Sequence, residues 1–391
     1  MWLILITAAC IILVIYHHLG YPLILRWVRQ HKRGIAAPHT QHDLPCKPLV
    51  ESQLPSVVII VPAYNEATWI ADKIRNTAAL NYPAEKLTLL IGCDGCDDAT
   101  YHIAQSTLSE PECQGLQAKV VNFVNNRGKV AVLNQLAKMA QGDLLAFSDT
   151  SALLSIDALL ITAKHFQTPA VGVLNGSYCL LTQPNYGEQA YWQYQNRIKA
   201  SEAQLGATLG AHGAFYVIRQ ALFRPLEADT INDDFILPMR LVADGHQFVY
   251  DDNIHAVEQE PSSEQQDHRR RQRIAAGNMQ QLLRLKQLCL PRYKGIAFAF
   301  LSGKGLRVLM PYLMITALIG SGILAFTHAQ FATVFWLQVL AYGIAAVELI
   351  FKPKRSPAWV KALGYLVAGH SAGLIGSMRY LLHLDKGHWS K

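Results

Sequence analysis

The chain has 391 residues, of which 51% are hydrophobic, and its mean hydropathy is positive, which is high for a soluble protein. Its formal net charge of +7 includes the basic run at 268–273. In a chain with membrane-spanning segments, which the apolar runs described below predict, basic residues mark the cytoplasmic side and are attracted to anionic lipid. We therefore do not expect a nucleic-acid-binding protein. Among the seven cysteines, Cys93 and Cys96 form a C-x-x-C motif. Because no second pair follows to complete a zinc site, free thiols are expected.

The N-terminal segment is apolar from residue 2 to about residue 28. It holds about 25 residues without Asp, Glu or Lys, which is long enough to cross a hydrocarbon core. A cleaved signal peptide is the alternative, but the segment has no basic beginning and its apolar stretch is longer than such peptides require. The sequence therefore predicts a transmembrane anchor at 1–28.

Two further apolar segments, 308–326 and 331–351, predict a hairpin of membrane spans in the C-terminal third. A third segment, 359–382, is rich in glycine and carries His370 and Arg379. It could span the bilayer, re-enter it or lie in the interface, and the sequence leaves this open.

Basic residues predict how the chain is oriented. One cluster follows the first span and another follows the hairpin: Arg26, Arg29, Lys32 and Arg33, and then 352–355. Both clusters belong in the cytoplasm by the positive-inside rule. The resulting domains are an anchor at 1–28, a linker at 29–55, a cytoplasmic domain at 56–290 and, at 291–391, an interfacial helix with two or three spans.

Between the membrane segments, strand patterns alternate with helix patterns. A run rich in β-branched residues occurs at 56–64, further strand patterns occur at 86–95, 118–124 and 143–151, and helical spacing occurs at 67–80 and 129–141. This order predicts an α/β fold with a doubly wound, mainly parallel sheet. Glu66, Asp94 and Asp149 each follow a predicted strand, and ligands of such sheets bind at the carboxyl ends of the strands.

Five motifs in order resemble one enzyme family. They are VPAYNE (61–66), CDGCDDAT (93–100), NRGKVAVLN (126–134), FSDTS (147–151) and NDDFILPMRL (232–241). The region 55–290 is similar to the inverting glycosyltransferases of family 2, which have the GT-A fold. The resemblance is greatest to the membrane-anchored branch that includes poly-N-acetylglucosamine, chitin, hyaluronan and cellulose synthases.

The resemblance implies a site for a nucleotide-sugar donor. It assigns Ala63, Tyr64, Glu66 and Asp94 to the base and ribose, and Lys129 to the diphosphate. The alternatives are ordinary: Glu66 could cap a helix, Asp94 could belong to a turn, and Lys129 could be a solvated surface lysine.

The resemblance also implies a divalent cation, Mg²⁺ or Mn²⁺, at the FSDTS motif. Asp149 is the carboxylate ligand and a donor-binding residue. Ser151 stands where a second aspartate is usual, so a contact there would come from a hydroxyl or through water. Hard cations accept such oxygen ligands.

Asp233 and Asp234 are adjacent carboxylates at the head of a predicted helix. Asn232 as the N-cap, with acidic residues in the first turn, is one explanation for the pair. The resemblance gives another: Asp234 matches the catalytic base of the family, and the charge of Asp233 raises its proton affinity.

The resemblance places the acceptor beside two further segments. Gly210, His212, Gly213 and Ala214 would form a floor under the transferred sugar, with His212 alternatively structural. Arg270 to Ile274 match the family's Q-x-x-R-W motif, with Arg273 as the catalytic cation, Arg270 in place of Gln, and Ile274 in place of Trp. A solvated basic helix face is the alternative there. Nearby aromatic residues, Tyr191, Trp192 and Tyr194, could stack on sugars or belong to the core.

The resemblance thus implies a membrane-embedded transferase, and we expect it in the inner membrane with its catalytic domain in the cytoplasm. It would move a hexose or N-acetylhexosamine, UDP being the expected carrier, to a growing polysaccharide or lipid-linked glycan. Processive synthesis and single addition remain open. Membrane lipid and polysaccharide export subunits are the further partners considered. The alternative is a catalytically silent subunit that binds a nucleotide-sugar or a cyclic dinucleotide.

Overall fold

The computed structural model describes residues 1–31, 51–181, 186–260, 264–351 and 356–384, without the side chains of 186–194 and 264–270. The described chain forms two compact units. One comprises Leu25–Ser262 and Leu285–Ala297, and the other comprises Met1–Ile24, Ser263–Arg284 and Phe298–Asp385.

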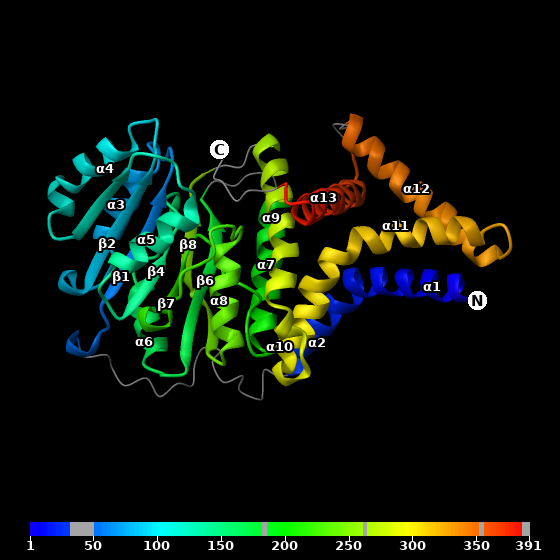
Figure 1. Cartoon of the computed structure of the whole chain (residues 1–391), viewed down its shortest axis with the longest axis horizontal. Coiled ribbons are helices and arrows are strands. Elements are labelled where there is room, and N and C mark those ends of the chain that lie inside the picture. Colours follow the sequence, from blue (N-terminus) through cyan, green and yellow to red (C-terminus); the bar gives the residue numbers. More distant parts are fainter. Residues whose placement is uncertain (32–50, 182–185, 261–263, 352–355, 385–391) are drawn as a thin grey trace. The chain divides into compact units, whose positions relative to one another are not determined.

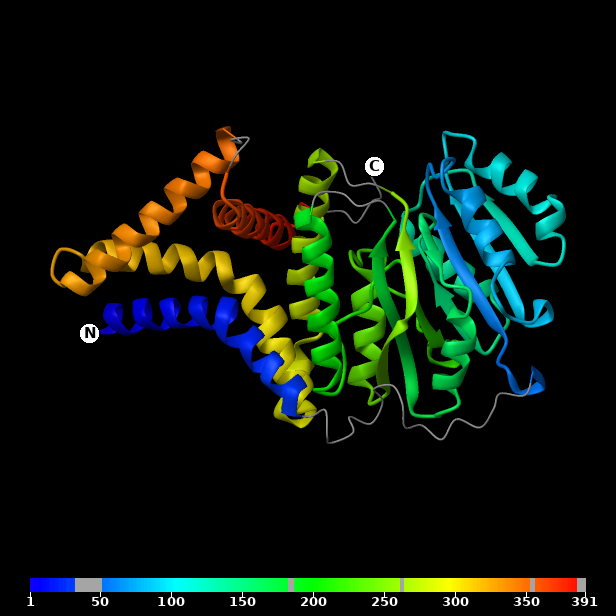
Figure 2. The ribbon, with the colours of Figure 1, turned by 180° about the vertical axis from the view of Figure 1, so that it is seen from behind.

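The first unit is built on an eight-stranded sheet (Figure 1, and from behind in Figure 2). The strand order is β3-β2-β1-β4-β7-β6-β8-β5. The strands are β1 (Val57–Ala63), β2 (Leu87–Asp94), β3 (Gln117–Phe123), β4 (Leu144–Phe147), β5 (Ala152–Leu154), β6 (Val171–Leu180), β7 (Tyr216–Arg219) and β8 (Gln247–Glu258).

The direction of the strands changes across the sheet. β3, β2, β1 and β4 are parallel neighbours, as the sequence predicts, and β6 is parallel to β8. β7 is antiparallel to both β4 and β6, and β5 is antiparallel to β8. The predicted parallel sheet is therefore confirmed, and an antiparallel strand in its middle is a feature that the sequence did not indicate.

Helices cover the sheet. They are α3 (Ile70–Ala78), α4 (Thr100–Leu108), α5 (Lys129–Met139), α6 (Ala158–Phe166), α7 (Tyr186–Ala203) and α8 (Asp233–Ala243). All residues of β1 are buried, as expected for a continuous apolar strand that is covered on both faces. α5 packs on β1 and β2, whereas α6, α7 and α8 pack on β6 and β8.

The second unit is helical. It contains α1 (Trp2–Ile15), a π-helical turn η1 (Tyr16–Gly20), α9 (Glu264–Arg284), a second π-helical turn η9 (Phe300–Gly305), α11 (Leu306–Leu324), α12 (Ala329–Phe351) and α13 (Ala358–Leu381). α1 packs on α11, and α13 packs on α9 and α12.

Within the described chain, three helices are long and apolar enough to cross a membrane: Trp2–His31, Gly295–Leu324 and Ala329–Phe351. They include the predicted anchor and both arms of the predicted hairpin. α13 is a continuous helix that does not belong to these three. The greater part of the predicted linker and the basic cluster at 352–355 lie outside the described residues.

Candidate active site

The predicted donor residues gather at one edge of the sheet. β1 ends at Ala63, which is fully buried, and the half-buried Tyr64 follows it. β2 ends at Asp94, and Asp149 follows β4. Because these strands are parallel neighbours, their carboxyl ends open at the same edge.

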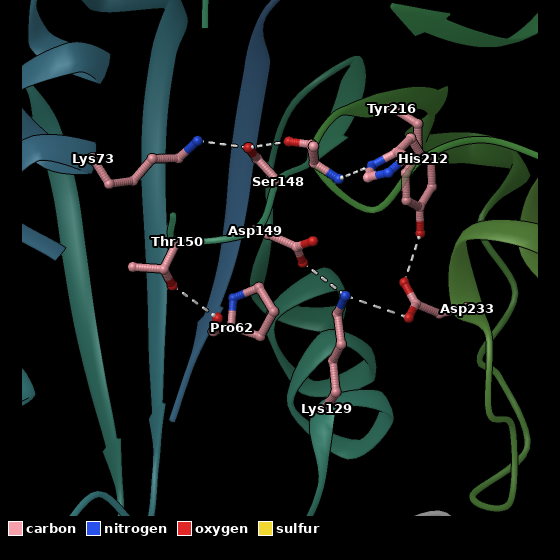
Figure 3. Close-up of polar contacts among 10 residues, drawn as sticks. Pro62, Lys73, Lys129, Ser148, Asp149, Thr150, His212, Tyr216 and Asp233 are labelled. Carbon is pink, nitrogen blue, oxygen red and sulfur yellow. Dashed lines mark hydrogen bonds and ion pairs between the residues drawn. The ribbon is translucent and has the colours of Figure 1, made fainter. Parts of the chain in front are cut away.

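Lys129, the first residue of α5, lies between two carboxylates (Figure 3). Its Nζ is 2.8 Å from Oδ1 of Asp149 and 3.6 Å from Oδ1 of Asp233. Tyr216 donates a hydrogen bond of 3.2 Å to the other oxygen of Asp233. Burial disfavours the charge of Lys129, but the two carboxylates outweigh it and raise the pKa of the ammonium. Lys129 is therefore a stable cation at the centre of the cluster.

The two adjacent aspartates differ in their surroundings. Both open α8, where Asn232 occupies the N-cap position without a side-chain bond to the helix. The Asp233 side chain is only 6% exposed and is held by Lys129, whereas Asp234 is half-buried. Burial and then the charge of Asp233 raise the pKa of Asp234 to about 6. The ammonium groups of Lys129 and Lys199 act in the opposite direction.

Asp94 is fully buried and organises the loop that leads to Lys129. Its carboxylate accepts bonds from the backbone N–H of Arg127, at 3.0 and 3.1 Å, and of Gly128, at 2.8 Å. Gly128 has a φ of 89°, which glycine adopts without strain. The donor contact predicted for Asp94 remains a prediction, but its place beneath this loop was not foreseen.

Asn65 and Glu66 join the loops that follow β1 and β2. Oδ1 of Asn65 accepts a bond from the N–H of Asp97 at 2.9 Å, and the N–H of Glu66 donates to Oγ1 of Thr100 at 2.8 Å. α3 begins only at Ile70 and has no side-chain cap. The carbonyl of Glu66 accepts the N–H groups of Trp69 and Ile70, each at 3.0 Å, so its backbone pairs with the start of this helix.

The predicted acceptor floor lies directly against the Asp149 loop. The N–H of Asp149 donates to the carbonyl of Gly213 at 3.2 Å, and a Cβ at Gly213 would lie 2.9 Å from Oδ2 of Asp149. The ring of His212 stacks on Tyr178 with centroids 3.9 Å apart, and its Nδ1 accepts a bond from the N–H of Ala214. His212 thus has a structural role in shaping this turn.

Two bonds connect the start of the same segment to its neighbours. Nζ of Lys199 donates to the carbonyl of Gly210 at 2.7 Å. The N–H of Ala211 donates to the carbonyl of Asp234 at 2.8 Å. The glycine-rich turn is thereby fixed to the head of α8.

The family model described as glycosyltransferase like family 2 matches residues 55–277. The chain belongs to this family. A beta-monoglucosyldiacylglycerol synthase of Trichormus variabilis is 30% identical over 203 residues, covering 50% of this chain and 43% of that protein. A poly-beta-1,6-N-acetyl-D-glucosamine synthase of Staphylococcus aureus is 24% identical over 207 residues, covering 51% of this chain and 48% of that protein. The matched region thus spans less than half the length of these curated relatives.

Among solved structures, the chain is similar to the mannosyltransferase PcManGT from Pyrobaculum calidifontis, solved in complex with GDP-Man and Mn²⁺. The TM-score is 0.72 and the sequence identity is 22%, with 97% of this chain and 99% of that chain covered. The predicted GT-A fold is confirmed, and helices on both sides of the family 2 domain are long and apolar enough to cross a membrane.

A divalent cation fits this family 2 site through one carboxylate. Asp149 is partly exposed, at 34% of its side chain, whereas Ser151 is nearly buried. In the part of the chain that the structure describes, no three His, Cys, Asp or Glu residues gather to hold a metal. A cation bound to a diphosphate needs few protein ligands, because phosphate and water oxygens complete its coordination. Asp149 can supply the protein ligand. Its Oδ1 already forms an ion pair with Nζ of Lys129.

Arg273, the predicted cation of the Q-x-x-R-W counterpart, lies on α9 in the helical unit and is exposed, as is Ile274. Next to them, the guanidinium of Arg271 lies 4.4 Å from the centre of the Tyr365 ring. The role of Arg273 remains a prediction. The predictions for side chains at Arg270, Tyr191, Trp192 and Tyr194 lie outside the described residues.

Sequence reasoning missed two residues of the cluster. Tyr216 lies on β7, an antiparallel strand that was not predicted, and Lys199 lies on α7. The sequence signal for both residues was their place in the stretch 189–223, which contains the predicted acceptor floor at 210–214.

We expect kcat/KM for sugar transfer to fall as the pH decreases through about 6, because a base must be ionised and the pKa of Asp234 is raised to about 6. The measurement is the pH profile of nucleotide release. Two variants should shift the pH at which kcat/KM falls on the acid side of this profile, the acid limb, in opposite directions. Asp233→Asn removes a charge that raises the pKa, so the limb should move to lower pH, whereas Lys129→Met should move it to higher pH. A limb that stays in place in both variants would exclude Asp234 as its origin.

Proposed function

We propose that this chain is a membrane-embedded inverting glycosyltransferase. It transfers a hexose or N-acetylhexosamine from a UDP-linked donor to a growing polysaccharide or a lipid-linked glycan. The observation that carries the proposal is the unequal aspartate pair: Asp233 is held by Lys129 and Tyr216, and Asp234 stands beside it with a raised pKa. A silent binding subunit has no use for a carboxylate poised in this way.

The proposed chemistry follows from these positions. The acceptor hydroxyl attacks the anomeric carbon on the face opposite the diphosphate, which inverts the configuration, and Asp234 accepts the hydroxyl proton. Lys129 has its ammonium at the same edge and can neutralise charge on the leaving diphosphate. Arg273 is proposed to add a second cation.

The choice of donor and acceptor rests on relatives. A glucosyldiacylglycerol synthase and a poly-N-acetylglucosamine synthase each match about half of this chain. Their names favour glucose or N-acetylglucosamine as the sugar, and a lipid or a glycan as the acceptor. Ala63, Tyr64, Glu66 and Asp94 are the proposed nucleoside contacts.

The test of the proposal compares substitutions on one helix. Asp234→Asn keeps the shape and removes proton acceptance, so transfer should fall roughly 10²- to 10⁴-fold. Purified protein would be given UDP-glucose, UDP-N-acetylglucosamine, UDP-glucuronic acid and GDP-mannose, and nucleotide release and product size would be measured. Asp233→Asn should lower the rate less. Asp244→Asn, at the exposed C-terminal end of α8, is the control.

Two further measurements show whether a loss of transfer rate in Asp234→Asn comes from the chemical step. Asp234→Asn should still bind UDP, because the proposed nucleoside pocket is unchanged. Its melting temperature should not fall, because the raised pKa of Asp234 means that the folded state disfavours the charge that this substitution removes. A folded Asp234→Asn protein that transfers sugar at nearly the wild-type rate would refute Asp234 as the base. If the wild type binds a donor and releases no nucleotide, the silent-subunit alternative gains.

We also propose that Asp149 ligates Mg²⁺ or Mn²⁺, which supplies charge neutralisation for the diphosphate. The Mn²⁺ in the Pyrobaculum calidifontis complex supports this choice. We expect chelator to abolish transfer, and Asp149→Asn to require at least ~10-fold more Mn²⁺ for half-maximal rate, since a neutral amide is a weaker ligand than a carboxylate. Asp157→Asn, an exposed carboxylate that opens α6, is the control. Full wild-type activity in chelator would contradict the assignment.

The three apolar helices support an integral membrane protein, and we propose that its catalytic domain faces the cytoplasm, where nucleotide-sugars are made. Reporter fusions at His42 and after Arg355 should then both read cytoplasmic, because basic residues flank both positions. A fusion at Thr327, between α11 and α12, should read on the other side. A periplasmic reading at His42 would invert the proposed topology.

A further inference from the structure

Lys73 is a fully buried lysine in α3, between the equally buried Ile70 and Ile74. Lysines are almost never fully buried unless their ammonium is paired. Here Nζ donates to Oγ of Ser148 at 2.5 Å and to the carbonyl of Ala152 at 2.6 Å. The donor and acceptor contacts proposed above make no use of this side chain.

The two oxygens that Lys73 contacts flank Asp149 on either side. Ser148 precedes the carboxylate, and Ala152 begins β5 after it. One ammonium therefore ties together both ends of the loop 148–152, which carries Asp149. Figure 3 shows the contact with Ser148.

The contact also extends to the proposed acceptor floor. Because Oγ of Ser148 accepts from Lys73, its own hydrogen is donated onward to the carbonyl of Ala214 at 2.7 Å. Gly213, the preceding residue, accepts the N–H of Asp149. The loop and the floor are thus joined twice, once through backbone and once through Lys73 and Ser148.

We propose that Lys73 is a positioning residue for sugar transfer, holding the Asp149 carboxylate in register with the 213–214 backbone. The inference rests on the proposed function, since it concerns the same site. Lys73 touches neither donor nor acceptor in this scheme. It acts through the loop that it ties.

The bonds do not depend on the charge of the amine. Burial lowers the pKa of Lys73 to about 7, while the charges of Asp149 and Glu258 oppose that shift. A neutral amine keeps two N–H groups, and Lys73 uses two acceptors. The tie can therefore persist on both sides of neutral pH.

The experiment uses the full-length protein in detergent with four variants. Lys73→Met fills a similar volume and removes both bonds of the ammonium. Ser148→Ala removes the link to Ala214 and one of the two ammonium bonds, and it leaves the bond from Lys73 to Ala152 in place. The double variant and Lys164→Met, on an exposed lysine of α6, complete the set. The measurements are melting temperature, binding of UDP without metal, kcat, KM for the donor, and the Mn²⁺ concentration at half-maximal rate.

We expect Lys73→Met to lower kcat roughly 10- to 100-fold, because small displacements of a reacting group have effects of this size. It should also raise the Mn²⁺ requirement while leaving UDP binding unchanged. Lys73→Met takes the donor away from Oγ of Ser148 and the carbonyl of Ala152, so the melting temperature should also fall, and the rates are compared at a temperature at which every variant is folded. Ser148→Ala should have a smaller effect, and the double variant should resemble Lys73→Met.

Several outcomes would overturn the inference. If kcat and Mn²⁺ requirement are unchanged in both single variants, Lys73 is a structural lysine only. Multiplying losses in the double variant would mean that the two residues act separately. If Lys73→Met does not fold, an unaltered Ser148→Ala overturns the inference. Failure of the proposed function has a separate signature: the wild type itself releases no nucleotide from any donor.

Discussion

The site depends on one ammonium among three carboxylates. Asp149, Asp233 and Asp234 approach the same edge of the sheet, where burial and then the charges of Asp233 and Asp149 make the charge of Asp234 harder to form. Lys129 lies within 2.8 Å of Asp149 and 3.6 Å of Asp233, so it stabilises two of the charges directly. Asp234 is left with the raised pKa. The different surroundings of the two paired aspartates thus follow in part from where one cation is placed.

That placement is a product of the fold. Lys129 opens α5 because Asp94, at the end of β2, captures the backbone N–H groups of the preceding loop. Asp149 lies at the end of β4 and Asp233 at the start of α8. β7 completes the arrangement: by pairing antiparallel to β4, it brings Tyr216 beside Phe147, just before the Asp149 loop. A sheet with parallel strands alone would carry that residue away from this edge.

Much of the first half of the domain could be predicted from the sequence, because strands β1, β2 and β4 are buried, mainly apolar runs and α5 has helical spacing. The antiparallel strands could not, since their pairing depends on partners distant in the sequence. The burial of Lys73 could not be predicted either. Lys73 stands in an amphipathic pattern where a lysine indicates the solvated face, and only its tertiary partners show that it is buried. The structure gives α9, with Arg273, to the helical unit, which the motif spacing did not indicate.

If Lys129 binds the diphosphate as proposed, proton uptake by Asp234 and donor binding are thermodynamically linked. Lys129 lowers the proton affinity of Asp234 while its charge is available to the cluster. A diphosphate that engages this ammonium adds negative charge at the same place, and both changes favour a proton on Asp234. By reciprocity, a protonated Asp234 favours the bound donor. On this proposal, the heat of donor binding near pH 6 contains an ionisation contribution from the buffer, and the pKa of Asp234 is higher in the donor complex than in the free protein.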